Sequence, residues 1–500
     1  MTKRIALNDD NRRWWTLAAM CFALFMIMLD NTVVNVALPS IQEDLGASLA
    51  TLAWTVSAYT LSLGVLLITG GRLGDIYGRR RVFLIGVVLF AASSAFIGFS
   101  QTEAWLIGGR AVQGIGAALM MPATLSIITN TFPPQERGKA LGTWAGVSAL
   151  ALAIGPVVGG YLVEYVSWQS IFFLNVPVAI GTLAITLFST HESRDESVAK
   201  TLDVAGIVTI SIGLGALTLA LLEAHAWGWD SPQTLGLLAV AVLGIVAFAV
   251  VERRVRVPMV DFEFFGSRTF LGASLVAFIV SFAMLAMFFF IAIYMQTIEG
   301  YTPLQAGIRF LPTTLCIILI SPFSGRLADS IGPRPLMTGG LVLVAVSLFW
   351  QSFLMVGSGF GFLAPGFILM GIGMGFIMSP MSTAAMNAVD RTKAGVAGGI
   401  LSMSRMIGGT LGIAVLGALV GNPSDPAAYV ASLGDGLLVG SIVAALGAVV
   451  AWTLVSPDVA AQSPLVPAGE AALPPVDDRG HAARESGRPA VVGQASESAT

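Results

Sequence analysis

Gly71-Arg-Leu-Gly-Asp-Ile-Tyr-Gly-Arg-Arg80 is repeated later in the chain as Gly325-Arg-Leu-Ala-Asp-Ser-Ile-Gly-Pro-Arg334, with six of the ten positions identical. Each copy follows the second long apolar segment in a block of six such segments. A shorter echo pairs Gly114-Ile-Gly116 with Gly371-Ile-Gly373, each in the fourth apolar segment of its block. These repeats predict two related six-helix bundles, an arrangement that forms two halves around a central site in many membrane proteins.

The composition of the chain is that of a membrane protein. Hydrophobic residues make up 55% of its 500 residues, charged residues only 11%, and the mean hydropathy is +0.82. Because soluble domains carry about 25% charged residues, we do not expect a soluble enzyme or a nucleic-acid-binding protein. The two cysteines, Cys21 and Cys316, lie in apolar segments, which argues against a disulfide framework and against a multi-cysteine metal site.

Fourteen apolar segments are long enough to cross a bilayer as helices, which takes about 20 residues each. They lie near residues 14–38, 51–70, 82–99, 105–129, 138–161, 168–189, 203–222, 233–251, 270–295, 303–325, 336–356, 360–386, 395–420 and 434–455. Every Lys and Arg that lies outside these segments and the C-terminal tail stands before the first segment or on an even-numbered connection. By the positive-inside rule, both termini are predicted to be cytoplasmic.

These segments predict an all-α polytopic membrane protein with five regions. The predicted regions are a cytoplasmic N-terminus (1–13), an N-terminal six-helix bundle (14–189), a linker with two extra helices (190–269), a C-terminal six-helix bundle (270–455) and a tail (456–500). The tail is rich in Pro, Ala, Gly and Ser, which predicts a disordered cytoplasmic segment. It is either a regulatory or docking segment or a solvated end without a role.

Four motifs carry a family resemblance. Leu29-Asp-Asn-Thr-Val-Val-Asn-Val-Ala-Leu-Pro39 resembles the first-helix signature of the fourteen-helix drug:proton antiporters of the major facilitator superfamily. Gly71–Arg81 is similar to the superfamily's loop 2–3 motif, Arg110-Ala-Val-Gln-Gly-Ile-Gly116 to its fourth-helix motif, and Gly146 to Gly160 to its antiporter motif in the fifth helix. The resemblance extends to about Gly412 and implies the major-facilitator fold, with two six-helix bundles, two extra linking helices and export by alternating access.

Asp30 is the only acid deep inside any predicted span. An ionised carboxylate is costly at that depth, so we expect its side chain to face the interior of the bundle. A carboxyl group that is neutral when buried and ionised when wetted is what proton coupling requires, and the resemblance also implies a protonation site here. Arg110, the other isolated deep charge of the first block, is predicted to hold Asp30 in one state and release it in another. The alternatives are a structural aspartate for Asp30 and a rigid salt bridge or a carbonyl clamp for Arg110.

Seven further residues are predicted to contact the substrate. Three are polar neighbours of the predicted proton site on the first and fourth helices, and four belong to methionine-rich stripes on the ninth and twelfth helices: Asn31, Asn35, Gln113, Met284, Phe288, Met374 and Met378. Methionine adapts its shape and is common at binding surfaces that accept many ligands. The same stripes are equally compatible with core packing or with a lipid-facing surface.

The repeated loop motif places Asp75 and Asp329 among arginines, with Arg79 and Arg80 in the first copy. These residues are predicted to form charged latches that hold the inward gate closed. The alternative is a solvated loop whose arginines only set the topology.

In the fifth helix, Gly155, Pro156 and Gly159 are predicted to form a smooth surface for close helix contact between moving parts. Static packing explains the same residues equally well.

The predicted function is proton-driven export of lipophilic, often cationic compounds across the cell membrane. The predicted partners are a small-molecule substrate, protons and the bilayer, and the outer connections carry acids but no base, which suits the release of cations. No cofactor, metal or enzymatic activity is predicted, because no lysine lies in a phosphate-binding loop and the three histidines lie in loops or in the tail. The alternatives are a dedicated exporter of one secondary metabolite, lipid or siderophore and, in another class, a channel or a membrane-embedded sensor.

Overall fold

The computed structural model describes residues 9–194, 201–255, 258, 260, 262–389, 394–420 and 425–457. Within these residues the protein is helical and has no strand, and fourteen helices are long and apolar enough to cross a membrane. This confirms the predicted all-α polytopic class and the predicted number of spans. From residue 458 onward, the predicted tail lies outside the described residues.

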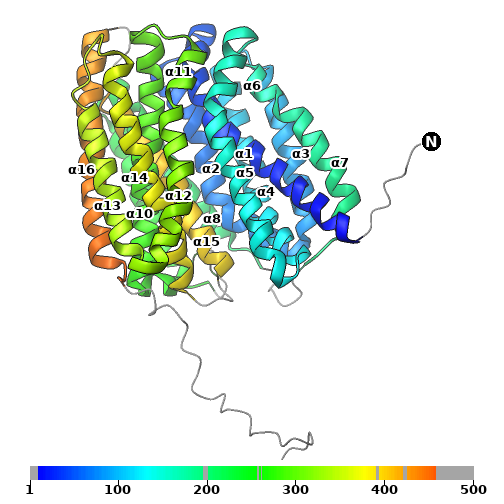
Figure 1. The fold of residues 1–500 in the computed structure, drawn as a ribbon. Helices are drawn as coiled ribbons and strands as arrows, with labels where there is room; N and C mark the ends of the chain where they lie inside the picture. Colours follow the sequence, from blue (N-terminus) through cyan, green and yellow to red (C-terminus); the bar gives the residue numbers. More distant parts are fainter. Residues whose placement is uncertain are drawn as a thin grey trace, which may run out of the picture. The chain divides into compact units, whose positions relative to one another are not determined.

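Helices α1 to α7 pack against one another (Figure 1). In this group α4 lies against α2 and α3, α1 lies against α5 and α7, and α3 also contacts α7. The bounds are α1 Asp9–Leu45, α2 Leu49–Tyr77, α3 Arg79–Gly98, α4 Glu103–Thr131, α5 Pro134–Tyr165, α6 Ser170–Phe173 and α7 Asn175–Ser189.

Helices α10 to α16 form a second group with the same order of contacts. Here α14 lies against α12 and α13, α10 lies against α15 and α16, and α13 contacts α16. The bounds are α10 Arg268–Ile293, η2 Tyr294–Ile298, α11 Pro303–Arg309, α12 Leu311–Ile331, α13 Pro333–Gln351, α14 Gly359–Asn387, α15 Ala394–Gly417 and α16 Pro426–Leu454, preceded by the short turn η1 Phe262–Gly266. The repeated pairing is the structural counterpart of the sequence repeat.

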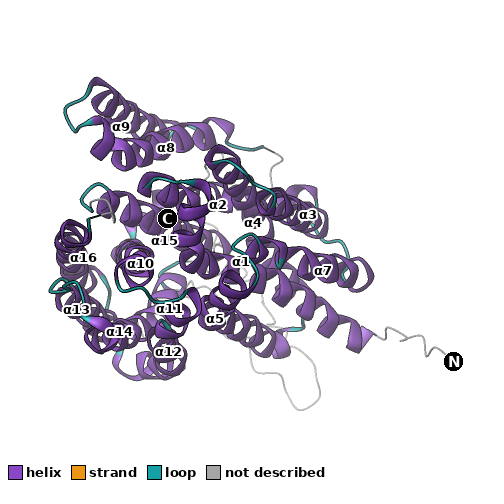
Figure 2. Cartoon of the chain, turned by 90° about the horizontal axis from the view of Figure 1, so that it is seen from above, coloured by secondary structure: helices purple, strands orange, loops and turns teal. Residues whose placement is uncertain are grey.

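The two groups meet along two main seams. Helix α2 packs against α15, and α5 packs against α11 and α12. The remaining two helices, α8 (Val204–Trp227) and α9 (Pro232–Glu252), pack on each other. Figure 2 shows this pair at the outside of the helical assembly, with α8 beside α2 and α15.

Two predicted spans are each divided into two helices by a proline. Pro177 lacks the N–H that would bond to the carbonyl of Phe173, where α6 ends. Pro312 likewise cannot bond to the carbonyl of Ile308, and α11 ends at Arg309. The last helix begins earlier than its predicted start at residue 434, because Asp425 accepts hydrogen bonds from the backbone N–H groups of Ala427 and Ala428 and caps α16.

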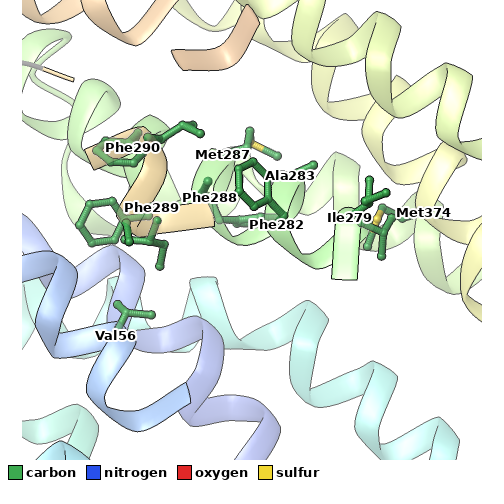
Figure 3. Packing of buried hydrophobic residues seen from close by; sticks show 14 of the residues in the cluster. Val56, Ile279, Phe282, Ala283, Met287, Phe288, Phe289, Phe290 and Met374 are labelled. Atoms are coloured by element: carbon green, nitrogen blue, oxygen red, sulfur yellow. The ribbon is translucent and has the colours of Figure 1, made fainter. Parts of the chain in front are cut away.

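Helix α10 supplies the centre of the largest apolar cluster. Figure 3 shows Phe282, Met287 and Phe289 packed together on α10, with Val56 of α2 in the same cluster. Phe288 stacks on Phe310, with ring centroids 4.6 Å apart. Because this cluster draws residues from both groups of helices, it links them through apolar burial.

Candidate functional site

Asp30 in α1 and Arg110 in α4 form a buried ion pair. Nη1 of Arg110 lies 2.5 Å from Oδ2 of Asp30, and each residue is only 1% exposed. Nε of Arg110 donates to the carbonyl oxygen of Thr55 at 2.9 Å, and the guanidinium carbon lies 4.2 Å from the centroid of the Tyr59 ring. A buried ion pair is tolerated only when its remaining donors and acceptors are satisfied, and these contacts provide that.

Gln113 completes the network around the ion pair. Its Nε2 donates to Oδ1 of Asp30 at 3.0 Å and to the hydroxyl of Ser94 at 2.7 Å, and its Oε1 accepts from Arg110 at 2.6 Å. Asn175 of α7 donates to the same Ser94 hydroxyl at 3.1 Å. Gln113 is fully buried, so the structure places this predicted substrate contact beside the carboxylate. Ser94 and Asn175 were not predicted.

The geometry suits the ionised form of Asp30. Each carboxylate oxygen accepts a hydrogen bond, one from Arg110 and one from Gln113. Protonation would add an O–H donor to one of these oxygens and remove the negative charge that Arg110 faces. Arg110 would then keep Thr55 and Gln113 but lose its counter-charge. The ion pair therefore joins α1 to α4 through a contact that depends on the charge of Asp30.

The two predicted asparagines lie on the same helix as Asp30. Asn31 donates from Nδ2 to the carbonyl oxygen of Ile27 at 2.9 Å, and Asn35 donates to the carbonyl oxygen of Asn31 at 3.3 Å. Oδ1 of Asn35 is buried and has no hydrogen-bond partner within the described part of the chain. Asn35 thus offers one free acceptor to a ligand or to water.

The four apolar residues that are predicted to contact the substrate differ in burial. Phe288 and Met374 lie in the core of the large cluster, whereas Met284 and Met378 pack on its edge and keep some exposed surface. Of the four, only Met284 and Met378 can therefore meet a ligand without repacking.

The first loop motif is held by two sets of charges. Asp75 accepts from Arg79 through Nη2 at 2.8 Å and through Nε at 2.9 Å. The backbone N–H groups of Arg80 and Arg81 donate to the carboxylate of Glu192 at 3.0 and 3.2 Å. Glu192 was not predicted, and it places a negative charge at the N-terminus of α3, where the helix dipole favours one.

Arg80 also donates from Nη2 to the carbonyl oxygen of Leu187, at 2.9 Å. The second copy of the motif lies at the end of α12. The side chain of Asp329 lies outside the described part of the structure, so the second predicted latch stays a prediction.

The glycines of the α5 motif allow close contact with α1. A Cβ atom on Gly155 would lie 2.0 Å from Oγ1 of Thr32, and one on Gly159 would lie 2.5 Å from Cγ2 of Val33. Both distances are far below van der Waals contact, so neither position admits a side chain in this arrangement.

The same motif meets the second group of helices. A Cβ atom on Gly307 of α11 would lie 2.1 Å from the carbonyl oxygen of Pro156. The backbone N–H of Leu304 donates to the carboxylate of Glu164 at 3.1 Å, and Nε2 of Gln296 donates to the carbonyl oxygen of Val36 at 3.0 Å. The ends of α1 and α5 are therefore joined to η2 and α11 in this structure.

The profile of the Major Facilitator Superfamily matches residues 20–413, with a second match over residues 310–486. The chain is 38% identical over 409 residues to the tetracenomycin C resistance and export protein of Streptomyces glaucescens, covering 82% of this chain and 76% of that protein. It is 36% identical over 406 residues to the multidrug resistance protein Stp of Mycobacterium tuberculosis (strain CDC 1551 / Oshkosh), covering 81% and 75%.

Among solved structures, a bacterial homologue of the human lysosomal transporter Spinster, in an inward-facing and unoccupied conformation, has a similar fold. The TM-score is 0.61 at 17% sequence identity, and the match covers 88% of this chain and 96% of that one.

Proposed function

Because the chain belongs to the Major Facilitator Superfamily, we propose that it is a proton-coupled antiporter that exports lipophilic compounds, cations among them, by alternating access. The observation that carries this proposal is the buried ion pair of Asp30 and Arg110. The Asp30 carboxylate accepts hydrogen bonds from the charged Arg110 and from the neutral Gln113. Two similar proteins are named for antibiotic export and for multidrug resistance, which supports export rather than uptake.

Helix α1 links this ion pair to the contacts of α1 and α5 with η2 and α11, which we call the outer contacts. A proton that arrives from outside neutralises Asp30 and removes the counter-charge of Arg110, so α1 and α4 shift relative to each other. Thr32, Val33 and Val36 lie within two turns of Asp30 further along α1 and contact α5 and η2. When these contacts are open, protonation of Asp30 displaces the substrate to the outer side. The resulting shift of α1 closes the contacts, and the proton is released on the cytoplasmic side.

We assign the two moving halves to residues 14–189 and 270–455, with residues 190–269 as a linker. The repeated contact pattern of α1–α7 and α10–α16 supports this division. The halves share two main seams, α2 with α15 and α5 with α11 and α12, along which they would rock.

A dedicated exporter of one product is the second candidate. The tetracenomycin C resistance and export protein is named for a single antibiotic, and it is more than a third identical to this chain. A panel of chemically unrelated dyes and antibiotics separates the two candidates, because a dedicated exporter moves one member of the panel and a multidrug exporter moves several.

The proposed function is tested with inside-out membrane vesicles in which an acid interior is imposed. The exporter should then concentrate a fluorescent cation such as ethidium inside the vesicles, and dissipating the pH gradient with nigericin should release it. Accumulation that depends only on ATP, or that ignores the gradient, would contradict proton coupling.

The first prediction concerns orientation in the cell membrane, with both termini cytoplasmic. Tags at residue 1, in the 190–202 loop and in the tail should be protected from an impermeant reagent outside intact cells. A tag near Gly228, between α8 and α9, should be labelled. A tail that is labelled from outside would contradict an even number of spans with a cytoplasmic N-terminus.

The second prediction concerns the latch at Asp75. Asp75→Asn removes the charge that pairs with Arg79 and is expected to lower the transport rate sharply, because the charged latch is lost. Because Glu192 caps α3 independently, the variant should still fold and bind substrate. Asp329→Asn should have a smaller effect, since Pro333 and Pro335 stand where the first copy has two arginines. Equal and negligible effects of both substitutions would favour a purely topological role.

A further inference from the structure

Three arginines lie well inside the spans, and two of them contact groups beyond their own helix. Arg110 is held by Asp30, Thr55 and Gln113. Arg309 donates to the carbonyl oxygen of Gln305 at 3.0 Å, and its guanidinium carbon lies 3.8 Å from the centroid of the Tyr301 ring. The third arginine, Arg405, stands at the middle of α15.

Arg405 has no counter-charge among the residues that the structure describes. Its one hydrogen bond runs from Nη2 to the hydroxyl of Ser402, one turn earlier on the same helix, at 3.1 Å. Its Nε, like that of Arg309, is buried without a hydrogen-bond partner among the described residues. A clamp between helices would bring the guanidinium to a carbonyl or carboxylate of a neighbouring helix, and here no such contact exists in the described part.

The contacts of its neighbours on α15 show which side of the helix Arg405 occupies. Gly408 and Gly412 lie against α10, where a Cβ atom on either would meet the backbone of Phe278 or Phe282 at 2.2 Å. Thr410 faces α2, because its hydroxyl lies 2.7 Å from that of Thr60. At 100° per residue, Arg405 lies about 20° from Gly412 and about 140° from Thr410 around the helix, so its side chain leaves α15 on the side that faces α10.

An arginine near the centre of a membrane costs several kcal/mol unless it is paired or faces water, which makes such a residue a candidate functional site. Arg405 and Ser402 both keep part of their surface exposed, so neither residue is fully enclosed by the described part of the chain. The five donors of a guanidinium form a rigid planar fork that suits carboxylate, sulfonate and phenolate oxygens.

We propose that Arg405, assisted by the Ser402 hydroxyl, binds the acidic group of transported compounds, so that the exporter carries lipophilic anions and zwitterions as well as cations. This inference rests on the proposed export function and adds a substrate class to it. The bound acid supplies the counter-charge that Arg405 lacks, and the apolar part of the same compound lies against the neighbouring helices.

The test compares two probes of opposite charge in inside-out vesicles with an acid interior: anilinonaphthalenesulfonate, which is an anion, and ethidium, which is a cation. Wild-type protein should accumulate both. Arg405→Gln is expected to raise the KM for anilinonaphthalenesulfonate about tenfold or more, as befits the loss of a charge-assisted contact, and to leave the KM for ethidium within about twofold. Arg405→Lys keeps the charge without the fork, and should fall in between.

Arg309→Gln is the matched control, because it removes the same charge from an arginine that already has partners, and it should not change the preference between the probes. A thermal-shift titration of the purified Lys variant with anilinonaphthalenesulfonate provides a second readout if the Gln variant does not fold. Equal loss of both probes in Arg405→Gln would overturn the inference and indicate a structural role. Wild-type vesicles that export ethidium but not the anion would overturn it as well, and would leave the proposed function standing.

Discussion

Asp30→Asn is expected to abolish uphill export while the protein still folds and reaches the membrane. The amide has nearly the shape of the carboxylic acid but does not titrate, so the variant is fixed in an analogue of the protonated state. Its Oδ1 can still accept from Arg110 or from Gln113, the two donors that hold the wild-type carboxylate. Facilitated equilibration of substrate is expected to survive, because the residues that surround the substrate are unchanged.

The size of the effect follows from the driving force. Each pH unit supplies about 1.36 kcal/mol per proton, and a membrane potential supplies about 2.3 kcal/mol per charge per 100 mV. Losing the coupled proton should therefore lower the accumulation ratio of ethidium from about tenfold or more to about one. Asp30→Glu is the control, since it restores a titratable group one methylene away and should keep partial coupling with a shifted pH optimum. Wild-type accumulation by Asp30→Asn would place the proton site elsewhere.

Gly307→Ala is expected to abolish transport by preventing the outer contacts from closing. The added Cβ atom would lie 2.1 Å from the carbonyl oxygen of Pro156, a backbone atom that cannot move aside alone, so α5 and α11 must separate. A reporter cysteine at position 36, which is fully buried in wild-type protein, should then react with an impermeant maleimide from the outside.

Gly146→Ala is the matched control on α5. A Cβ atom there meets nothing within 4 Å, so this variant should transport normally and keep the reporter cysteine protected. Normal transport by Gly307→Ala would show that the contact between α5 and α11 is dispensable for closure.

The fold was largely predictable because membrane insertion depends on composition. Fourteen apolar runs and the alternation of Lys and Arg gave the number of spans, and the motifs gave the superfamily; the structure and the family match confirm both. Helix bounds were less predictable, since a cap is a local hydrogen bond that hydropathy does not register. Asp425 begins α16 well before the apolar run, and Pro177 and Pro312 divide helices inside runs that stay apolar throughout.

The candidate site was predictable where charge was isolated. Asp30 and Arg110 are lone charges in one apolar block, and two such charges lower their burial cost by meeting. Ser94 and Asn175 could not be predicted, because single hydroxyl and amide groups occur in many membrane helices. The sequence does not show which residues of the methionine stripes are buried, since an apolar side chain fits equally well in the core or at its edge. Met374 lies in the core and Met378 at its edge.

Movement of protons in exchange for substrate tests the central claim most directly. Purified protein is reconstituted into liposomes that are loaded with ethidium and an internal pH indicator, with equal pH on both sides. Ethidium that leaves down its own gradient should drive protons inward, so the interior should acidify with wild-type protein and stay unchanged with Asp30→Asn. Ethidium efflux without acidification, or equal acidification with Asp30→Asn, would contradict proton antiport through this carboxylate.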